Sequence, residues 1–118
     1  MAERTVSEVY SNTNCLVVKT NANITDGDTT PYMSMGTWQC VVVFTTGTDT
    51  DLELQITPDD GTTDITLSGS KAGVYFAYDE ANNVGIVQQP IGKVRALGGT
   101  NTDAVVFFMF FRNSNRGT

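Results

Sequence analysis

The sequence contains no histidine and only two cysteines among its 118 residues. Without histidine, neither a catalytic triad with a histidine base nor a histidine-ligated zinc site can form. Two cysteines alone supply too few thiolates for a structural zinc site, which takes four ligands. We therefore expect a protein that is not an enzyme and that carries no cofactor and no catalytic or metal centre.

Long apolar runs and an excess of positive charge are also missing. The longest apolar run, residues 104–111, is far shorter than the roughly 20 residues that a membrane-spanning helix needs. Seven basic residues stand against thirteen acidic ones, and the resulting net charge of −6 repels the phosphates of nucleic acid. Residues 1–12 show no apolar segment of a secretory signal. These features predict synthesis in the cytoplasm, with neither a membrane nor nucleic acid as a direct partner.

The two cysteines, Cys15 and Cys40, each lie in an apolar run. A small thiol packs in such surroundings like any other small apolar side chain. Because the inferred compartment is reducing, we expect two free thiols and no disulfide between them.

Residues 38–67 contain three apolar runs that are joined by turn-rich connections. In residues 52–57, LELQIT, apolar and polar side chains alternate, which predicts a strand with one face on a core and one in water. The segment PDDG that follows supplies proline, aspartate and glycine for a turn. Ile65 and Leu67 then alternate with polar residues again. Residues 52–67 are therefore predicted to form an antiparallel hairpin.

Further strand patterns recur along the chain at close, regular spacing. The expected strands cover residues 15–18, 38–44, 52–57, 64–67, 74–78, 84–87, 91–97 and 104–111. About eight short strands without helical patterns between them are typical of a sandwich or jelly roll. We predict an all-β, single-domain antiparallel β-sandwich, jelly-roll-like, over residues 1–118, with an N-terminal arm at 1–13 and a frayed tail at 112–118.

A long irregular connection, residues 21–37, is rich in asparagine, threonine, aspartate and glycine. Such a loop is uncommon in a small domain unless it has a function. We predict that the end of this loop and the N-terminal arm contact a partner. The residues assigned to these contacts are Val6, Val9, Tyr10, Tyr32, Met33 and Met35.

Carboxylates gather in three loops, namely Asp26 and Asp28, Asp49 and Asp51, and Asp59, Asp60 and Asp64. Loop carboxylates of this kind can bind calcium, but none of the three has the twelve-residue spacing that ends in a glutamate. Since aspartate also favours turns for backbone reasons, we interpret all three as turn residues. Arg95 and Lys93, on an expected strand, are predicted to be solvated or paired with a carboxylate across the sheet.

The last expected strand, residues 104–111, is apolar at every position and does not alternate. If the set that begins with Val105 and Phe107 points into the core, then Val106, Phe108 and Phe110 point outward; the opposite register exchanges the two sets. Leaving three such side chains in water forgoes about 5–8 kcal/mol, so we expect something to cover the second face. The cover is either the chain's own arm and loop or a neighbouring subunit, and we favour the subunit. Val106, Phe108 and Phe110 are accordingly assigned to the interface.

Two segments of the chain resemble small β-sandwich structural proteins of tailed bacteriophages. They are the hairpin at residues 52–67 and the later run at residues 90–108, PIGKVRALGGTNTDAVVFF. This family includes head decoration, or cement, proteins as well as neck and tail components. The shared features are a strand that ends near a proline, an Asp-Gly turn and a second strand. An arginine-bearing strand then leads through a Gly/Thr loop to an apolar final strand.

This resemblance implies a non-enzymatic virion protein, in first place a capsid decoration subunit. It implies association into a homo-oligomer, with a trimer favoured, and binding to the major capsid protein. It also implies that the protein is made in the host cytoplasm and resides in the virion. A neck, tail or fibre-associated protein is an alternative. A carbohydrate-binding module is another, and it requires exposed aromatic side chains, for which Trp38, Tyr75 and Tyr78 are the candidates.

Overall fold

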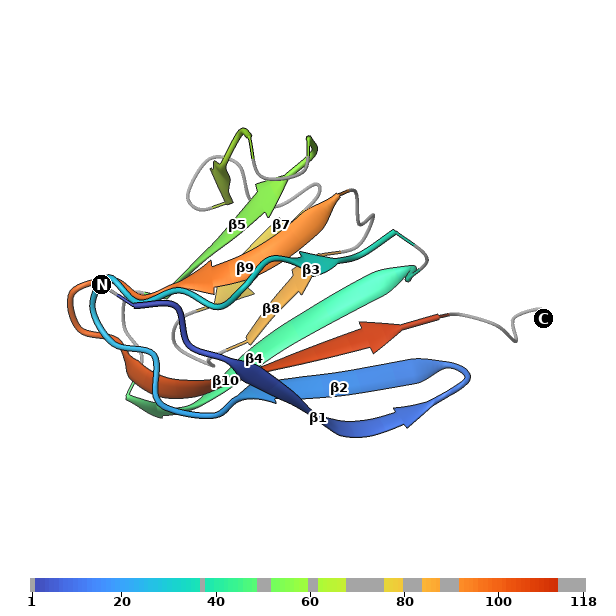
Figure 1. Ribbon diagram of the computed structural model, residues 1–118, viewed down its shortest axis with the longest axis horizontal. Coiled ribbons are helices and arrows are strands. Elements are labelled where there is room, and N and C mark those ends of the chain that lie inside the picture. Colours follow the sequence, from blue (N-terminus) through green and yellow to red (C-terminus); the bar gives the residue numbers. More distant parts are fainter. Residues whose placement is uncertain are drawn as a thin grey trace.

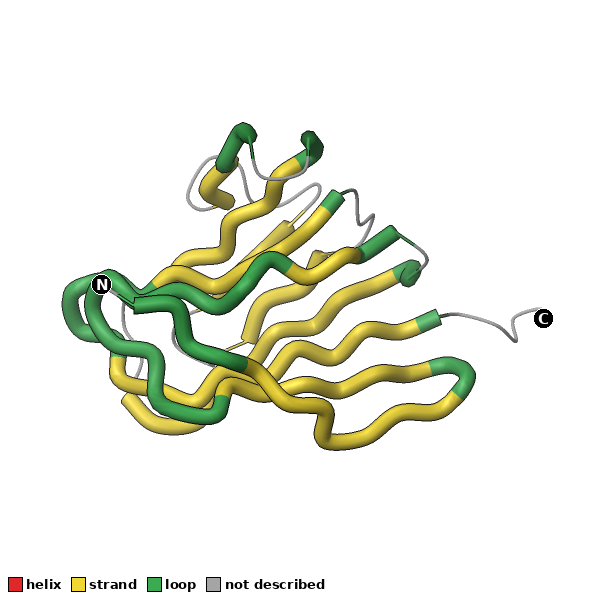
Figure 2. The backbone as a smooth tube through the Cα atoms, in the orientation of Figure 1, coloured by secondary structure: helices red, strands yellow, loops and turns green. Residues whose placement is uncertain are grey.

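The computed structural model describes residues 2–36, 38–48, 52–59, 62–67, 76–79, 84–87 and 92–112. Within these residues the chain consists of strands and loops, with no helix and hence none that could cross a membrane (Figure 2). The ten strands are β1 (Val6–Asn12), β2 (Cys15–Thr20), β3 (Met33–Ser34), β4 (Cys40–Thr48), β5 (Glu53–Thr57), β6 (Ile65–Leu67), β7 (Phe76–Asp79), β8 (Val84–Val87), β9 (Lys93–Leu97) and β10 (Asp103–Phe111).

The strands form two antiparallel sheets that pack as a sandwich (Figure 1). One sheet has six strands in the order β1-β2-β10-β4-β8-β7, and the other has four in the order β3-β9-β5-β6. Every pairing between strands is antiparallel. The predicted all-β antiparallel sandwich is confirmed. Each of the eight expected strands is present, and β1 and β3 are additional.

The predicted hairpin is formed by β5 and β6, with Leu54 opposite Leu67 and Ile56 opposite Ile65. Leu54 and Ile56 point into the core, as their spacing predicts. Gln55 was expected to face water, yet it is only 9% exposed. The reason lies in β9, where Arg95 is opposite Gln55 and donates a hydrogen bond from Nε to Gln55 Oε1 at 2.8 Å.

The core lies between the two sheets and is almost entirely aliphatic and aromatic. Its fully buried members from the six-stranded sheet are Val41, Val43, Val106, Phe108 and Phe110, and those from the four-stranded sheet are Leu54, Val94 and Ala96. Close packing of this kind leaves little room for a change of even one methylene group. The core therefore fixes which face of each strand points inward.

Strand β10 has the register opposite to the one we assigned. Val106, Phe108 and Phe110 are at most 1% exposed and pack against the four-stranded sheet. Their assignment to an interface is wrong, because the second sheet of the same chain covers them. The alternating set, half-buried on the other side of the strand, is Val105, Phe107, Met109 and Phe111.

The N-terminal residues, expected to form an arm, are bound to the sandwich. Strand β1 pairs with β2 at the edge of the six-stranded sheet. Ahead of it, Glu3 forms a parallel bridge with Thr29, and Arg4 donates its backbone N–H to Thr29 O at 2.7 Å. The tail, residues 113–118, lies outside the described residues.

The long loop after β2 closes one end of the sandwich, next to the N-terminus (Figure 1). Ile24 pairs with Ala104 of β10, and Thr29 pairs with Leu97 of β9, so the loop ties one sheet to the other. Ile24 and Thr30 are fully buried. The length of this loop is therefore explained by its structural role at the end of the sandwich.

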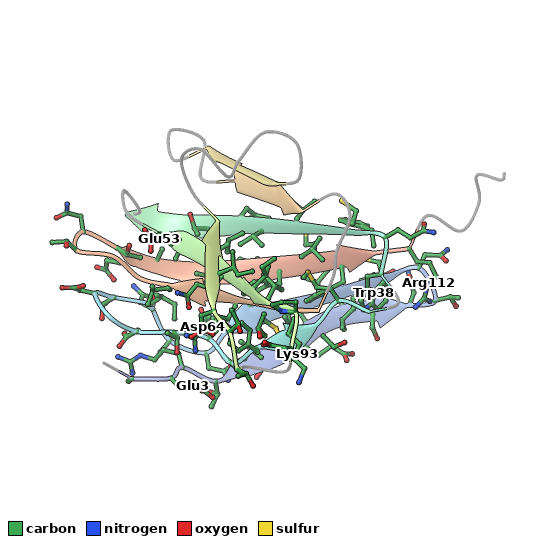
Figure 3. The ribbon with its side chains drawn as sticks, turned by 90° about the horizontal axis from the view of Figure 1, so that it is seen from above. Glu3, Trp38, Glu53, Asp64, Lys93 and Arg112 are labelled. Carbon is green, nitrogen blue, oxygen red and sulfur yellow. The ribbon has the colours of Figure 1, made fainter. Side chains whose placement is uncertain are left out.

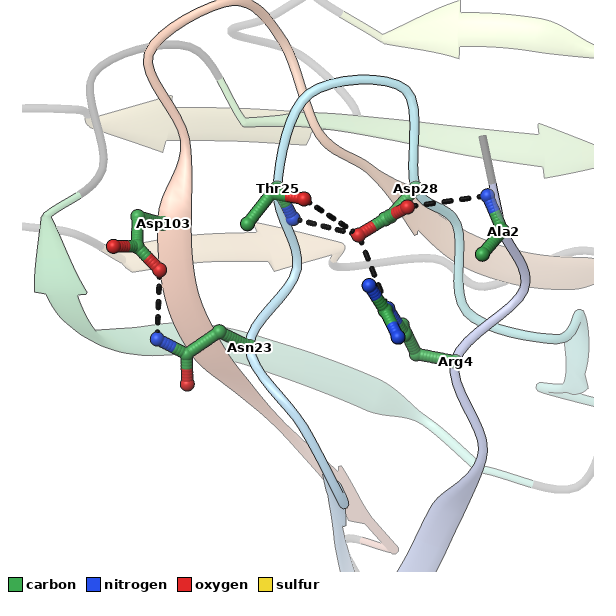
Figure 4. Close-up of polar contacts among 6 residues, drawn as sticks. All are labelled: Ala2, Arg4, Asn23, Thr25, Asp28 and Asp103. Carbon is green, nitrogen blue, oxygen red and sulfur yellow. Dashed lines mark hydrogen bonds and ion pairs between the residues drawn. The ribbon is translucent and has the colours of Figure 1, made fainter.

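Asp28 is the polar centre of this closure. Its carboxylate accepts hydrogen bonds from the backbone N–H of Ala2, from Arg4 Nε and from both the backbone N–H and the hydroxyl of Thr25, at 2.8–3.1 Å (Figure 4). The Thr25 bonds, helped by the Arg4 guanidinium, lower the pKa of Asp28 to about 2 against its burial. The charged form of Asp28 thus holds the N-terminal segment in place.

Candidate interaction surface

The side of the six-stranded sheet that faces away from the core is apolar over four neighbouring strands. All ten strands belong to one of the two sheets, so no strand of the described chain lies over this side. We call it the outer face. Its residues are Tyr10 from β1, Cys15 and Val17 from β2, Val105, Phe107, Met109 and Phe111 from β10, and Cys40, Val42 and Phe44 from β4.

Aligned strands place these side chains in rows across the sheet. Met109 lies between Val17 of β2 and Val42 of β4. Phe107 lies beside Phe44, and their rings are stacked with centroids 5.2 Å apart and planes 3° from parallel. These side chains shield one another from water. Each is half-buried, namely Val17, Val42, Phe44, Phe107 and Met109. The result is a continuous apolar layer.

The size of the outer face follows from sheet geometry. Four strands at about 4.8 Å each give a width of about 20 Å, and seven residues of β10 at about 3.4 Å each give a length of about 24 Å. The footprint is thus roughly 400–500 Å². Apolar patches of this size, about 300–600 Å², are the largest that monomeric proteins expose, and they are often functional.

Two charged side chains are described on this side of the sheet, one at its end and one directly opposite Phe107. Asp103 is the first residue of β10 and Lys19 is next to last in β2, and both are exposed. At the free edge of the sheet, the pairing of β1 with β2 shifts between Glu8 and Tyr10, which indicates a β-bulge. A bulge and a charge on an edge strand oppose edge-to-edge pairing.

Both cysteines lie on the outer face, on either side of Phe111 in β10. They are free and half-buried. Since one strand separates them, their Cα atoms lie about two strand spacings apart, which exceeds the roughly 7 Å that a disulfide permits. Burial raises the pKa of the Cys40 thiol. The expectation of free thiols is confirmed, and both thiols can report on access to the outer face.

The other residues assigned to contacts fall in different places. Val9 and Tyr10 are the most exposed, at 51% and 54%, and only Tyr10 belongs to the outer face. Tyr32 and Met33 are half-buried on the side of the four-stranded sheet, and Val6 is half-buried in β1. The assignment of Met35 is wrong because it is fully buried in the core. The assigned residues do not form one surface.

Tyr32 belongs to a polar cluster on the four-stranded sheet. Its hydroxyl donates a hydrogen bond to Asp64, and the guanidinium of Arg95 lies 4.5 Å from the centre of its ring. Arg95 Nη2 is also 3.6 Å from Asp64 Oδ2, so the predicted pairing of Arg95 with a carboxylate is confirmed. Burial, together with the bond to Asp64, raises the pKa of Tyr32 to about 12. All of these partners belong to the same chain. The cluster therefore holds the end of the long loop, at Tyr32, against strand β9 of the four-stranded sheet.

Trp38 does not offer a free ring for stacking on a sugar. The guanidinium of Arg112 lies 4.5 Å from the centre of the ring, and the two residues lie next to each other at the end of the sandwich (Figure 3). Phe110 is on the core side, with ring centroids 6.1 Å apart. Tyr75 and the side chain of Tyr78 lie outside the described residues. Nothing described here therefore favours a carbohydrate-binding module.

The acidic loops are explained in part by local hydrogen bonds. Besides Asp28, Asp59 accepts bonds from the backbone N–H and hydroxyl of Thr63 and from the hydroxyl of Thr57. Those bonds lower the pKa of Asp59. In the part of the chain that the structure describes, no three acidic or cysteine side chains are grouped to hold a metal ion. Residues 49, 51 and 60 lie outside it.

Comparisons with known proteins give a likeness in structure alone. No protein-family model and no curated protein sequence matches this chain. A cupin domain from Bordetella pertussis Tohama I matches with a TM-score of 0.48 and 10% identity, over 95% of this chain and 98% of its own. An RmlC-like cupin protein from Desulfovibrio desulfuricans matches with a TM-score of 0.50 and 13% identity, over 92% of this chain and 82% of its own. The likeness to the second of these proteins, together with the two antiparallel sheets, shows a jelly-roll-like β-sandwich fold.

Strand β10 has two apolar faces, and the one predicted to point outward is the one that points into the core. A signal for the correct choice is present in the sequence. Asp103, Val105 and Phe107 occupy every second position of β10, so their side chains point to the same face of the sheet. Because an aspartate is rarely buried, this face is expected to be the outer one. Lys19 likewise alternates with Val17 in β2. Charges at the ends of apolar strands thus identify the face that points outward.

Proposed function

We propose that this chain is a non-catalytic structural subunit that acts by association with other proteins, as a head decoration subunit of a tailed-phage virion. The observation that carries the proposal is the apolar outer face, which is as large as the largest apolar patches that monomeric proteins expose, and such patches are often functional. Its central residues, Val42, Phe107 and Met109, have no charged neighbour except Lys19 beside Phe107.

The energetics of this face favour association. Removing about 400 Å² of apolar surface from water on one partner stabilises a complex by about 10 kcal/mol before other terms, at 25 cal/mol per Å². The loss of translational and rotational freedom costs about 4–15 kcal/mol. An interface that buries this face on both partners can therefore offset that cost. Left uncovered, the same strands would promote aggregation.

The virion setting comes from the resemblance of residues 52–67 and 90–108 to phage decoration and tail proteins. Consistent with a role without catalysis, the sequence has no histidine. In this proposal the chain is made in the host cytoplasm, forms a homo-oligomer and braces the major capsid protein on the particle. The resemblance favours a trimer. No chemical reaction is assigned to the chain.

The proposal is tested by locating the chain in purified virions. Particles are separated into heads and tails, and the chain is quantified in each fraction by mass spectrometry. We expect it in the head fraction, and we expect the purified chain to bind assembled shells but not free capsid subunits. Its presence in the tail fraction alone would move the assignment to a neck or tail component. Absence from both fractions would refute a structural role in the virion.

A further inference from the structure

We infer that residues 2–12 form a strap that detaches from the sandwich as a unit while the two sheets stay folded, with the contact between Arg4 and Asp28 as its latch. The strap consists of the extended segment 2–5 and strand β1, and it covers the edge of β2 (Figure 1). A segment opens alone when the core of the protein does not depend on it. The burial of the strap's side chains meets that condition.

The strap contributes no side chain to the core. Every described member of the core cluster comes from residues 18–110. In β1 only Val6 is half-buried, and the six residues that follow it are exposed. Ahead of β1, none of residues 2–5 is buried. Because burial of apolar surface is the main favourable term in folding, loss of the strap removes little of what holds the two sheets together.

Hydrogen bonds hold the strap in place instead. Strand β1 is the edge strand and bonds to β2. Residues 2–5 are attached to the loop after β2 by three backbone bonds, from Arg4 N–H to Thr29 O, from Thr29 N–H to Ala2 O and from Asn21 N–H to Thr5 O, at 2.7–2.9 Å. Segments with few buried apolar contacts and exposed hydrogen bonds are those that open locally in folded proteins.

The latch is the charged bond among these attachments. Arg4 Nε donates to Asp28 Oδ2 at 3.1 Å, and the backbone N–H of Ala2 donates to Oδ1 of the same carboxylate at 3.1 Å (Figure 4). A hydrogen bond between charged groups is roughly twice as strong as a neutral one. Asp28 also accepts two bonds from Thr25, which lies outside the strap. The carboxylate therefore keeps partners when the strap leaves, and opening does not orphan a buried charge.

Opening of the strap changes the edge of the six-stranded sheet. Strand β1 has an irregular register between Glu8 and Tyr10, and a bulge on an edge strand opposes pairing with another strand. Strand β2, in contrast, pairs with β10 over residues 107–111 without a register shift. With the strap closed, the irregular β1 forms the edge, and with the strap open, the regular β2 forms it. The latch thus controls whether a regular strand edge is exposed.

The test is amide hydrogen exchange of the full chain, followed residue by residue by NMR and corrected for intrinsic rates. In the wild type, the amides of β1 that bond to β2 are expected to exchange more than about 100-fold faster than those between β10 and β4. Val43→Ala weakens the core and should speed exchange between β10 and β4 about tenfold, while leaving β1 unchanged, because the open and closed strap share the same core.

Arg4→Gln removes the charged donor of the latch and is expected to speed exchange along the whole of β1 about tenfold. Glu3→Gln is the matched control, since it removes a charge from the neighbouring exposed position and should exchange like the wild type. Ile56→Val replaces Val43→Ala if that variant fails to fold, and the comparison of strands in the wild type needs no variant.

Two results would overturn the inference. Equal protection of β1 and β10 in the wild type would mean that the strap opens only when the whole chain unfolds, and an equal effect of Val43→Ala on both strands would mean the same. Fast exchange in β1 that Arg4→Gln leaves unchanged would mean that the strand frays locally and that Arg4 and Asp28 do not act as a latch.

Discussion

Replacing Asp28 with asparagine is expected to lower the free energy of unfolding by about 2 kcal/mol at neutral pH. The side chain is 3% exposed and accepts four hydrogen bonds, three of them on Oδ2. Its pKa falls from 3.8 to about 2 on folding, and each unit corresponds to about 1.36 kcal/mol. An amide of the same shape would turn an NH₂ group toward donors such as Arg4 Nε and would lose the charge. The N-terminal segment would then be held more weakly.

The pH dependence of this effect follows from the direction of the shift. A carboxyl whose pKa is lower in the folded state stabilises the protein above its unfolded pKa, near 4, and this contribution is lost as the pH falls through about 2. At pH 3 about half of it should remain. The difference between wild type and Asp28→Asn should therefore shrink from pH 7 to pH 3.

Urea unfolding, followed by the fluorescence of the single tryptophan, Trp38, measures both variants at both pH values. Asp26→Asn is the matched control, since it removes the same charge from an exposed position in the same loop and should change stability by less than about 0.5 kcal/mol. A loss at Asp28 as small as that of the control, or one of equal size at pH 7 and pH 3, would refute the account of this anchor.

Three further changes test other parts of the fold. Phe108→Ala should lower the free energy of unfolding by about 3–5 kcal/mol in a urea titration, because Phe108 is fully buried in the core. A loss below 1 kcal/mol would contradict the register of β10. Gly98→Ala should cost about 1–3 kcal/mol, since the new Cβ would lie 2.2 Å from the carbonyl oxygen of Thr25; an unchanged melting temperature would contradict this close approach. Tyr32→Phe should remove the phenol that ionises near pH 12 in an ultraviolet titration, and loss of a phenol near pH 10 instead would argue against its bond to Asp64.

Local patterns in the sequence were enough to predict the strands. The alternation in residues 52–57 and the PDDG turn specify β5, β6 and their pairing, because both signals depend only on neighbouring residues. Strand β1 was not predicted, since its mostly exposed residues show no apolar alternation. It forms because the backbone of β2 offers a free edge, which is a property of the assembled sheet.

Features that depend on distant parts of the chain could not be predicted from local patterns. Residues 104–111 are apolar at every position, so alternation alone cannot say which face meets the other sheet. Asp28 becomes an anchor only because the fold brings Ala2 and Arg4 to it. Met35 was assigned to a contact from its loop position, but the pairing of β3 with β9 carries the chain into the core. In each case tertiary structure decides the role.

The reactivity of the native thiols tests most directly whether copies of the chain associate through the outer face, as the proposed function requires. Cys15 and Cys40 lie within that face, and a maleimide reports their accessibility by intact-mass spectrometry. If copies associate through this face, labelling of the wild-type chain slows as protein concentration rises. Met109→Glu, which places a carboxylate between Val17 and Val42, should react at one rate throughout. Labelling of the wild-type chain at the same rate at low and high concentration would contradict the account, because only shielding by another molecule depends on concentration.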